Sequence, residues 1–267
     1  MTLNVLSLAS GSNGNALLIQ SAGATILIDA GIAPQRLAQQ LRLRWIEPAA
    51  LTAICLTHEH SDHAFGAAGL ARRFDVPIVC NAATFAALGD PGLPHRLLAT
   101  GASLELGDLR LESFAVPHDA AAPVGYRVDH WSGSVGVATD LGEWDDAICA
   151  ALAPADLLLL EANHNLERLA LCRYPAHLKQ RIRGKRGHLS NVQTASLLAS
   201  LQRRSARRRT VWLAHLSARS NTPELALADV RNGLHQAGAT GFSLDVAPRG
   251  RPGPAWAGAQ AEQLRLI

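Results

Sequence analysis

The sequence lacks any apolar run long enough to cross a membrane. Its richest apolar stretch, residues 147–162, is too short for a span and is interrupted by Pro154 and Asp156. The first residues carry no basic segment followed by an apolar one, so we expect no secretory signal. Of the 267 residues, 48% are apolar and only 18% are charged, which excludes disorder for most of the chain.

Cysteine is also scarce. The four cysteines, Cys55, Cys80, Cys149 and Cys172, are far apart in the sequence and form no CxxC pair. Three of them lie in apolar or helical contexts, which indicates buried free thiols. This pattern is typical of a cytoplasmic protein, where thiols stay reduced.

Acidic residues are absent from one long segment. Between Arg168 and Pro223 there are thirteen Lys and Arg residues and no Asp or Glu, although the whole chain carries a net charge of only +3. The basic residues fall mainly into two groups, at residues 173–186 and 203–209. Such a segment is either a contact surface for a polyanion or the solvated face of ordinary helices.

The hydrophobic pattern predicts alternating short strands and helices. We expect strands at residues 3–8, 16–20, 25–29, 53–57, 78–80, 103–106, 109–116, 124–129, 134–138, 157–161, 211–214 and 241–246, and helices at residues 34–43, 64–74, 82–88, 144–152, 166–171, 176–182, 191–201 and 223–236. Ser190 is the expected N-cap of the helix at 191–201. Two similar halves, each a sheet flanked by helices, would give an α/β (α+β) fold with four layers. We expect one domain over residues 1–247 and a loose tail, rich in Pro and Gly, over residues 248–267.

The strongest chemical signal follows the apolar run that ends at Thr57. Within six residues the sequence places His58, His60, Asp62 and His63. Imidazole and carboxylate are the ligands of borderline transition metals. On a turn at a strand end, these side chains point in two directions, which suits two metal ions a few ångströms apart. The spacing differs from the helical HExxH zinc motif.

Three further ligand-type residues stand at the ends of apolar runs. These are His118, Asp140 and His215. One such residue alone is more often a capped or surface side chain. Together with the cluster at residues 58–63, the three would fit one rim of a sandwich.

These motifs resemble the metallo-β-lactamase fold hydrolases, whose HxHxDH motif stands here as residues 58–63. The resemblance runs from Leu3 to about Val246 and implies a four-layer αββα sandwich. It implies one metal held by His58, His60 and His118, and a second held by Asp62, His63 and His215, with Asp140 as the bridge. An early strand-end aspartate of the family corresponds to Asp29, usually in a structural role.

Within that family the sequence looks most like the YycJ/WalJ-type branch, which is nuclease-like. The resemblance implies 5′-to-3′ exonuclease activity on DNA. That branch usually has Asp where Asn165 stands here. The matching motifs lie at residues 9–15, 116–120, 161–164, 187–191 and 215–217.

A neighbouring phosphodiesterase family, ribonuclease Z, suggests a proton donor. The order Glu161, His188, His215 is similar to that family, in which a Glu–His pair serves the leaving group. We carry this role to His188, oriented by Glu161. The alternative makes Glu161 a strand-end charge and His188 part of a helix cap. His164 would contact substrate or cap a helix.

The resemblance implies a mechanism that uses two divalent metal ions, Zn or Mn, with Fe also compatible. Two ions lower the pKa of a shared water, so that a metal-bound hydroxide is available near neutral pH. Asp62 or Asp140 would orient it. Asn13 and Asn15, on a glycine-rich turn, could offer amides to a phosphate, and the basic segment, with Arg207 and Arg208, would hold DNA through its phosphates without reading sequence. Only twelve aromatic residues are present, so base stacking should matter less.

Two other functions compete with the nuclease. A small-molecule hydrolase of the same fold, acting on a thioester, lactone or lactam, would keep the metal ligands but not need the basic segment. A catalytically silent metal-binding regulatory protein is the third possibility, although the complete ligand set argues against it. The sequence predicts no membrane association and leaves the oligomeric state open.

Overall fold

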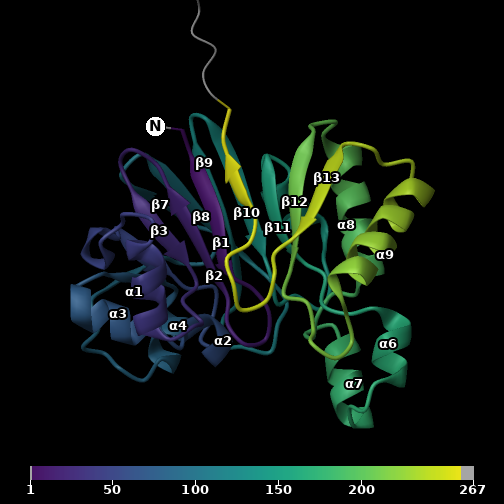
Figure 1. The fold of residues 1–267 in the computed structure, drawn as a ribbon, viewed down its shortest axis with the longest axis horizontal. Coiled ribbons are helices and arrows are strands. Elements are labelled where there is room, and N and C mark those ends of the chain that lie inside the picture. Colours follow the sequence, from purple (N-terminus) through teal and green to yellow (C-terminus); the bar gives the residue numbers. More distant parts are fainter. Residues whose placement is uncertain (1, 260–267) are drawn as a thin grey trace, which may run out of the picture.

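Two sheets packed face to face form the centre of the structure, and helices cover the outer face of each sheet (Figure 1). The computed structural model describes residues 2–259. No helix within this range is long and apolar enough to span a membrane. The four-layer αββα arrangement expected from the sequence is therefore confirmed.

Each sheet combines antiparallel and parallel strands. The first has the order β14 (Ala255–Ala257), β1 (Asn4–Ala9), β2 (Ala16–Gln20), β3 (Thr25–Ile28), β4 (Ala53–Cys55), β5 (Ile78–Cys80) and β6 (His95–Leu97). The second has the order β13 (Phe242–Val246), β12 (Arg209–Ala214), β11 (Leu157–Glu161), β10 (Gly133–Ala138), β9 (Val124–His130), β8 (Leu109–Ala115) and β7 (Ser103–Leu106). In both sheets the parallel strands include those that lead into the site, β3 with β4 and β10 with β11 and β12.

The helices divide between the two outer faces, except for a pair that lies apart. The helices are α1 (Pro34–Arg42), η1 (Pro48–Ala50), α2 (Ser61–Ala64), α3 (Ala67–Phe74), α4 (Ala82–Ala87), α5 (Asp146–Leu152), α6 (Leu166–Leu171), α7 (Ala176–Arg183), α8 (Asn191–Arg204) and α9 (Pro223–Gln236). Residues of α1 and α3 pack on the first sheet, and residues of α5, α8 and α9 pack on the second. Figure 1 shows α6 and α7 below the second sheet, beside the ends of its strands.

The central strands are buried on both faces, which explains their continuous apolar sequences. In β11, Leu157 and Leu159 face the core between the sheets, whereas Leu158 and Leu160 face the outer helices. The same alternation occurs in β4, where Ile54 lies on the helix side. Alternate side chains of a strand point to opposite faces, so a fully apolar run fills two cores at once.

Most predicted elements agree with the structure to within a few residues. Ser190 caps α8 and forms a capping box with Gln193. The helix expected at residues 64–74 is instead two pieces, α2 and α3, because the metal-ligand motif itself forms the first turn.

The loose tail expected from residue 248 is wrong for its first part. Residues Ala255–Ala257 form β14, which pairs antiparallel with β1 and places Trp256 opposite Val5. Trp256 packs against the core between the sheets. Strand β1 has free backbone groups on its outer side, and β14 satisfies them, so a Pro- and Gly-rich sequence still orders there. The rest of the expected tail, residues 260–267, lies outside the described residues.

Candidate metal centre

The metal-ligand motif is a tight turn between β4 and α2, held by the loop that follows β3. Asp29 Oδ1 accepts a hydrogen bond from the backbone N–H of Thr57 at 2.8 Å. The backbone N–H of Ala30 donates to the carbonyl of His63 at 2.7 Å. A Cβ on Gly31 would lie 1.7 Å from the carbonyl oxygen of Asp62, so only glycine permits this close approach. These contacts hold the turn through backbone atoms and Asp29.

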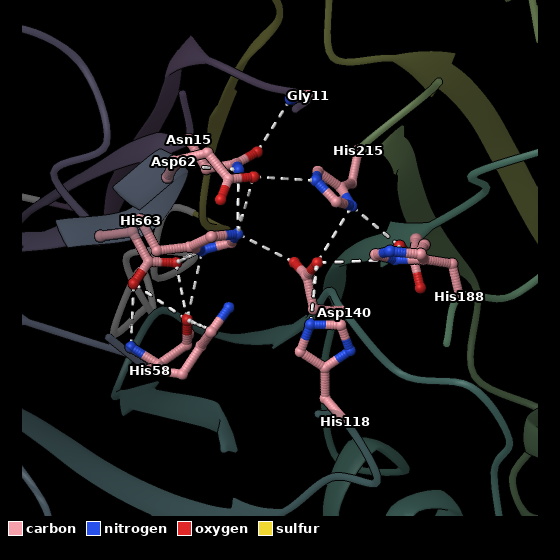
Figure 2. Close-up of polar contacts among 12 residues, drawn as sticks. Gly11, Asn15, His58, Asp62, His63, His118, Asp140, His188 and His215 are labelled. Atoms are coloured by element: carbon pink, nitrogen blue, oxygen red, sulfur yellow. Dashed lines mark hydrogen bonds and ion pairs between the residues drawn. The ribbon is translucent and has the colours of Figure 1, made fainter. Parts of the chain in front are cut away.

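The structure brings the predicted ligands together at the edge where the two sheets meet, and Figure 2 labels all of them except His60. Four overlapping groups have donor atoms within 4.8 Å of one another: His58, His60 and His118; Asp62, His63 and His215; His58, His63 and Asp140; and Asp140, Glu161, His188 and His215. The first two groups are the two trios that the family resemblance implied. Asp140 lies between them, with one oxygen 2.9 Å from His63 Nε2 and the other 3.7 Å from His118 Nε2.

The donor set fits metal ions, as its unsatisfied atoms show. His58 Nε2 and Asp140 Oδ2 are buried and make no hydrogen bond among the described residues. Buried polar atoms are normally paired, so orphaned ones indicate a missing partner. Asp140 Oδ2 is close to His63 Nε2 but not in hydrogen-bond geometry, as expected for two ligands directed at one ion. These atoms could therefore bind metal.

Buried carboxylates orient two of the histidines. Asp29 Oδ2 lies 2.7 Å from His63 Nδ1, and Glu161 Oε1 lies 2.8 Å from His215 Nδ1. Each carboxylate accepts a hydrogen bond from Nδ1–H, which leaves Nε2 directed into the centre. Such carboxylate–histidine pairs fix the ring and raise its basicity as a ligand.

Glu161 also holds His188. Its Oε1 lies 2.8 Å from His188 Nδ1, and its Oε2 accepts hydrogen bonds from the backbone N–H groups of Leu141 and Leu189. Burial alone would raise the pKa of the Glu161 carboxyl, but attraction to His188 and the hydrogen bonds with His188 and His215 lower it to about 2. Glu161 is therefore a fixed anion, and the structure places it between His188 and His215.

The same arrangement keeps protons on the histidines that face carboxylates. Burial lowers the pKa of His215, but Asp140, Asp62 and Glu161 outweigh that effect and raise it to about 10. The pKa of His188 is also raised, because Glu161 outweighs the burial of its ring. In contrast, burial holds the pKa of His58 below its ordinary value, and His63 adds to the lowering. Attraction to carboxylates thus raises the pKa of His188 and His215, whereas burial lowers that of His58.

Three strand-end residues of the centre have left-handed backbones. Asp29, Asp140 and His215 have φ of 61°, 56° and 53°. They follow β3, β10 and β12, respectively. This conformation is uncommon for residues other than glycine and concentrates at functional sites. It turns the chain sharply at the strand end, so that each side chain points along the sheet edge into the centre.

The two asparagines expected to contact substrate differ in position. Asn13 is exposed. Asn15 is buried, and its amide nitrogen lies 3.0 Å from His63 Nε2 and 3.2 Å from the carbonyl oxygen of Asp62. Asn15 Oδ1 accepts the backbone N–H of Gly11. Asn15 therefore positions the metal-ligand turn and is not free to bind substrate.

His164 and Asn165 lie behind the centre. His164 is buried with an unpartnered Nδ1, and burial lowers its pKa to about 4. It does not reach the surface. Asn165 caps α6 through the backbone N–H of Arg168, and its amide donates to Asp229 on α9. Its side chain thus ties α6 to α9 and takes no part in the ligand set.

Arg207 and Arg208, expected from the sequence to hold DNA, do not lie at the metal centre. They precede β12, whereas His215 follows it. Six residues of strand at about 3.3 Å per residue separate the two ends by about 20 Å. Arg207 instead pairs with Asp156. A continuous basic segment in the sequence is therefore divided between opposite ends of the sheet.

Sequence reasoning missed residues that act through the ligands. Thr57 Oγ1 lies within 3.3 Å of His58 Nδ1 and of His63 Nδ1 and donates to Asp29. Asp119 Oδ2 accepts a hydrogen bond from Arg181 Nε at 2.6 Å, and its other oxygen lies 3.3 Å from His118 Nε2. The sequence could have indicated both residues, because Thr57 directly precedes and Asp119 directly follows a metal-ligand candidate.

Comparisons with known proteins agree with this geometry. Residues 24–215 match the family described as a beta-lactamase superfamily domain. The chain is 36% identical over 238 residues to exodeoxyribonuclease WalJ of Streptococcus pneumoniae, covering 86% of this chain and 87% of the relative. It is 33% identical over 246 residues to exodeoxyribonuclease YycJ of Bacillus anthracis, covering 89% and 91%. Its fold is similar to that of the metallo-β-lactamase fold protein YhfI of Bacillus subtilis, with a TM-score of 0.73, 16% identity, and coverage of 96% of this chain and 100% of the other.

Proposed function

The chain belongs to the metallo-β-lactamase superfamily and is a metal-dependent hydrolase, and from this premise we propose that it is an exodeoxyribonuclease. It would remove nucleotides from DNA in the 5′-to-3′ direction without reading sequence. The relatives named exodeoxyribonucleases support a DNA substrate. The four free cysteines favour a reducing compartment, so we place the protein in the cytoplasm.

The observation that carries the proposal is a basic arm beside the centre, which we define as residues 166–186. It contains α6, α7 and the segment that returns to the site. Arg186 Nε donates to the carbonyl of the metal-ligand candidate His118 at 2.9 Å, so the arm adjoins the centre directly. Only two of its cations, Arg181 and Lys185, pair with carboxylates among the described residues. The other cations have no carboxylate partner among the described residues, and Arg181 uses only its Nε, so its terminal nitrogens also remain available to the phosphates of a strand.

Two divalent ions, Zn or Mn with Fe also compatible, would be held by the two trios, with Asp140 between them. When bound, they would supply hydroxide near neutral pH and neutralise charge on the phosphate. The protein's own side chains would perform the remaining tasks.

Asp62 is the group placed to orient the attacking water. Its carboxylate is part-exposed and lies 3.3 Å from His215 Nε2, at the open side of the centre. His188 is placed to protonate the leaving oxygen. Its Nδ1 is occupied by Glu161, its Nε2 makes no hydrogen bond among the described residues, and its side chain is 18% exposed. A general acid must present its proton to solvent or substrate in this way.

A nuclease time course tests the proposal. Purified protein is given Mn²⁺ or Zn²⁺ and 5′-phosphorylated DNA labelled at its 3′ end, with His63→Ala as the matched control. We expect metal-dependent shortening from the 5′ end and a loss of at least about 1,000-fold in the variant, because His63 lies in two donor groups.

Intact DNA with every metal would refute the proposal. Shortening from the 3′ end would keep the nuclease and reverse its direction. The small-molecule hydrolase would be supported instead by turnover of a thioester, lactone or lactam without DNA cleavage. Metal uptake with no turnover of any substrate would indicate the regulatory protein.

A further inference from the structure

A small pocket adjoins the metal centre on the side of His188. Its volume is about 120 Å³, and its lining includes Ser12, Tyr174, Arg181, His188 and Ser217. That space has room for a group of five heavy atoms, such as a phosphate.

The pocket presents hydrogen-bond donors and no carboxylate. The hydroxyls of Ser12 and Tyr174 and the terminal nitrogens of Arg181 make no hydrogen bond among the described residues. Ser217 Oγ accepts the backbone N–H groups of Arg219 and Ser220, so its own proton remains available. Asn163 also lines the pocket, and its amide nitrogen donates to the carbonyl of His215. The hydroxyls and the guanidinium give the pocket several free donors and a positive charge, which is complementary to an anion.

The cation of this pocket has a fixed position relative to the metal centre. Arg181 Nε donates to Asp119 at 2.6 Å, and Asp119 directly follows the metal-ligand candidate His118. The guanidinium of Arg219 lies 5.5 Å from the centre of the Tyr174 ring and adds positive charge beside the pocket. The His188 ring lies between pocket and centre, with its centroid 5.2 Å from that of His118 and 5.3 Å from that of His215.

From this geometry we infer that the pocket binds the terminal 5′-phosphate of a DNA strand. The inference rests on the proposed function and specifies its substrate. A hydroxide ion forms a bond to the scissile phosphorus, and the P–O3′ bond breaks with its electron pair on O3′. His188 Nε2 then gives its proton to O3′. The departing nucleotide therefore lies on the His188 side, where the pocket receives its 5′-phosphate.

This placement determines both the direction and the stepwise character of cleavage. The products are a 5′-mononucleotide with a free 3′-hydroxyl and a strand that is one nucleotide shorter. That strand carries a new 5′-phosphate, which is the group that the pocket accepts. Each cycle thus regenerates the preferred substrate. A strand that begins with a 5′-hydroxyl is a poor substrate for the first cleavage.

The test compares two oligonucleotides that differ only at the 5′ end, one phosphorylated and one with a hydroxyl, both labelled at the 3′ end. For the wild type, we expect kcat/KM to be about 10- to 100-fold higher for the phosphorylated strand, the range expected for hydrogen bonds to a charged group. Arg181→Ala should reduce this ratio to below about threefold, and Arg181→Lys should retain part of it. The ratio is measured within each variant, so any general loss of activity cancels.

Arg208→Ala is the matched control, because it removes an exposed arginine at the opposite end of β12 and should leave the ratio unchanged. Hydrolysis of bis(p-nitrophenyl) phosphate, which has no terminal phosphate, reports whether the wild-type centre is active. A wild-type ratio near one, or an unchanged ratio in Arg181→Ala, overturns the pocket while the nuclease stands. No cleavage of either strand overturns the proposed function as well, and hydrolysis of the small diester would then show that the centre itself was active.

Discussion

The two ends of the second sheet carry similar residues in different surroundings. At the carboxyl ends of β10, β11 and β12, Glu161 is fully buried and accepts hydrogen bonds from two histidines and two backbone N–H groups. At the amino end of β12, Arg207 and Asp156 form an ion pair that remains 44% and 31% exposed. Water screens the second network and is excluded from the first, so only the first can strongly shift pKa values.

Arg209 shows what the basic residues do at the amino end. It is buried, and its guanidinium donates to the backbone carbonyls of Ser205, Arg207 and Ala153. These contacts close the turn between α8 and β12. The cluster at residues 203–209 thus includes structural arginines, whereas the basic arm adjoins the centre. The role of a basic residue therefore depends on the strand end at which the fold places it.

Removing the charge of Glu161 should give the largest effect on activity. A small effect would contradict the contrast between the two ends of the sheet. Glu161→Gln keeps the shape but loses the charge that orients both His188 and His215. We expect kcat to fall about 1,000-fold or more, since general-acid and ligand-orienting contributions are lost together. The measurement is DNA cleavage with metal content determined in parallel. Asp156→Asn, at the other end, is the control and should change kcat less than about twofold.

Metal binding should depend on pH because protons and metal compete for the same imidazoles. His215 has a pKa raised to about 10, and that of His63 is raised well above its ordinary value, chiefly because attraction to carboxylates exceeds the effect of burial. These raised values stabilise the metal-free protein below about pH 6.5, and the contribution is lost as pH rises toward 10. Metal affinity should change oppositely, rising about tenfold per pH unit for each displaced proton.

Competition with a chromophoric chelator at pH 6.5, 7.5 and 8.5 would measure this rise. The Tm of the metal-free protein should fall over the same interval. An affinity that is constant after correction for the chelator's own protonation would contradict the assignment of protonated histidines at the centre.

The smallest expected effect separates the two basic groups. Lys179→Ala with Arg183→Ala, both on the basic arm, should raise KM for DNA about tenfold. The slope of log KM against log salt concentration should also fall, by the amount expected for the loss of about two phosphate contacts. Arg207→Ala with Arg208→Ala removes the same charge at the far end and should change KM less than about twofold. KM measured from 50 to 200 mM salt would decide. Equal effects of the two pairs would show that DNA extends over both ends.

The sequence predicted elements and ligand candidates well for particular reasons. The run at residues 157–161 is apolar at every position because both faces of β11 are buried, so its pattern was unambiguous. The candidates at 118, 140 and 215 follow β8, β10 and β12, which run in the same direction and therefore end at one edge of the sheet. The family resemblance then divided these residues into trios that the structure brings together.

What the sequence could not predict was the position of one chain segment relative to another. Nothing in residues 203–209 shows that β12 carries them away from the centre. Asn15 resembled a substrate contact until its burial against His63 was known. Strand β14 was missed because its order depends on an edge of β1, which is remote in sequence.

The seam between the two halves of the chain has a consequence for folding. Donors from residues 58–63 meet donors from residues 118–215 only after the sheets dock. That docking is also supported by long-range contacts, such as His215 N–H to Ser10 Oγ and Tyr126 Oη–H to the carbonyl of Leu56. Such non-local contacts form late and slowly. Metal ions held at this seam would therefore be captured only by a nearly completed fold, and they would stabilise that fold against unfolding.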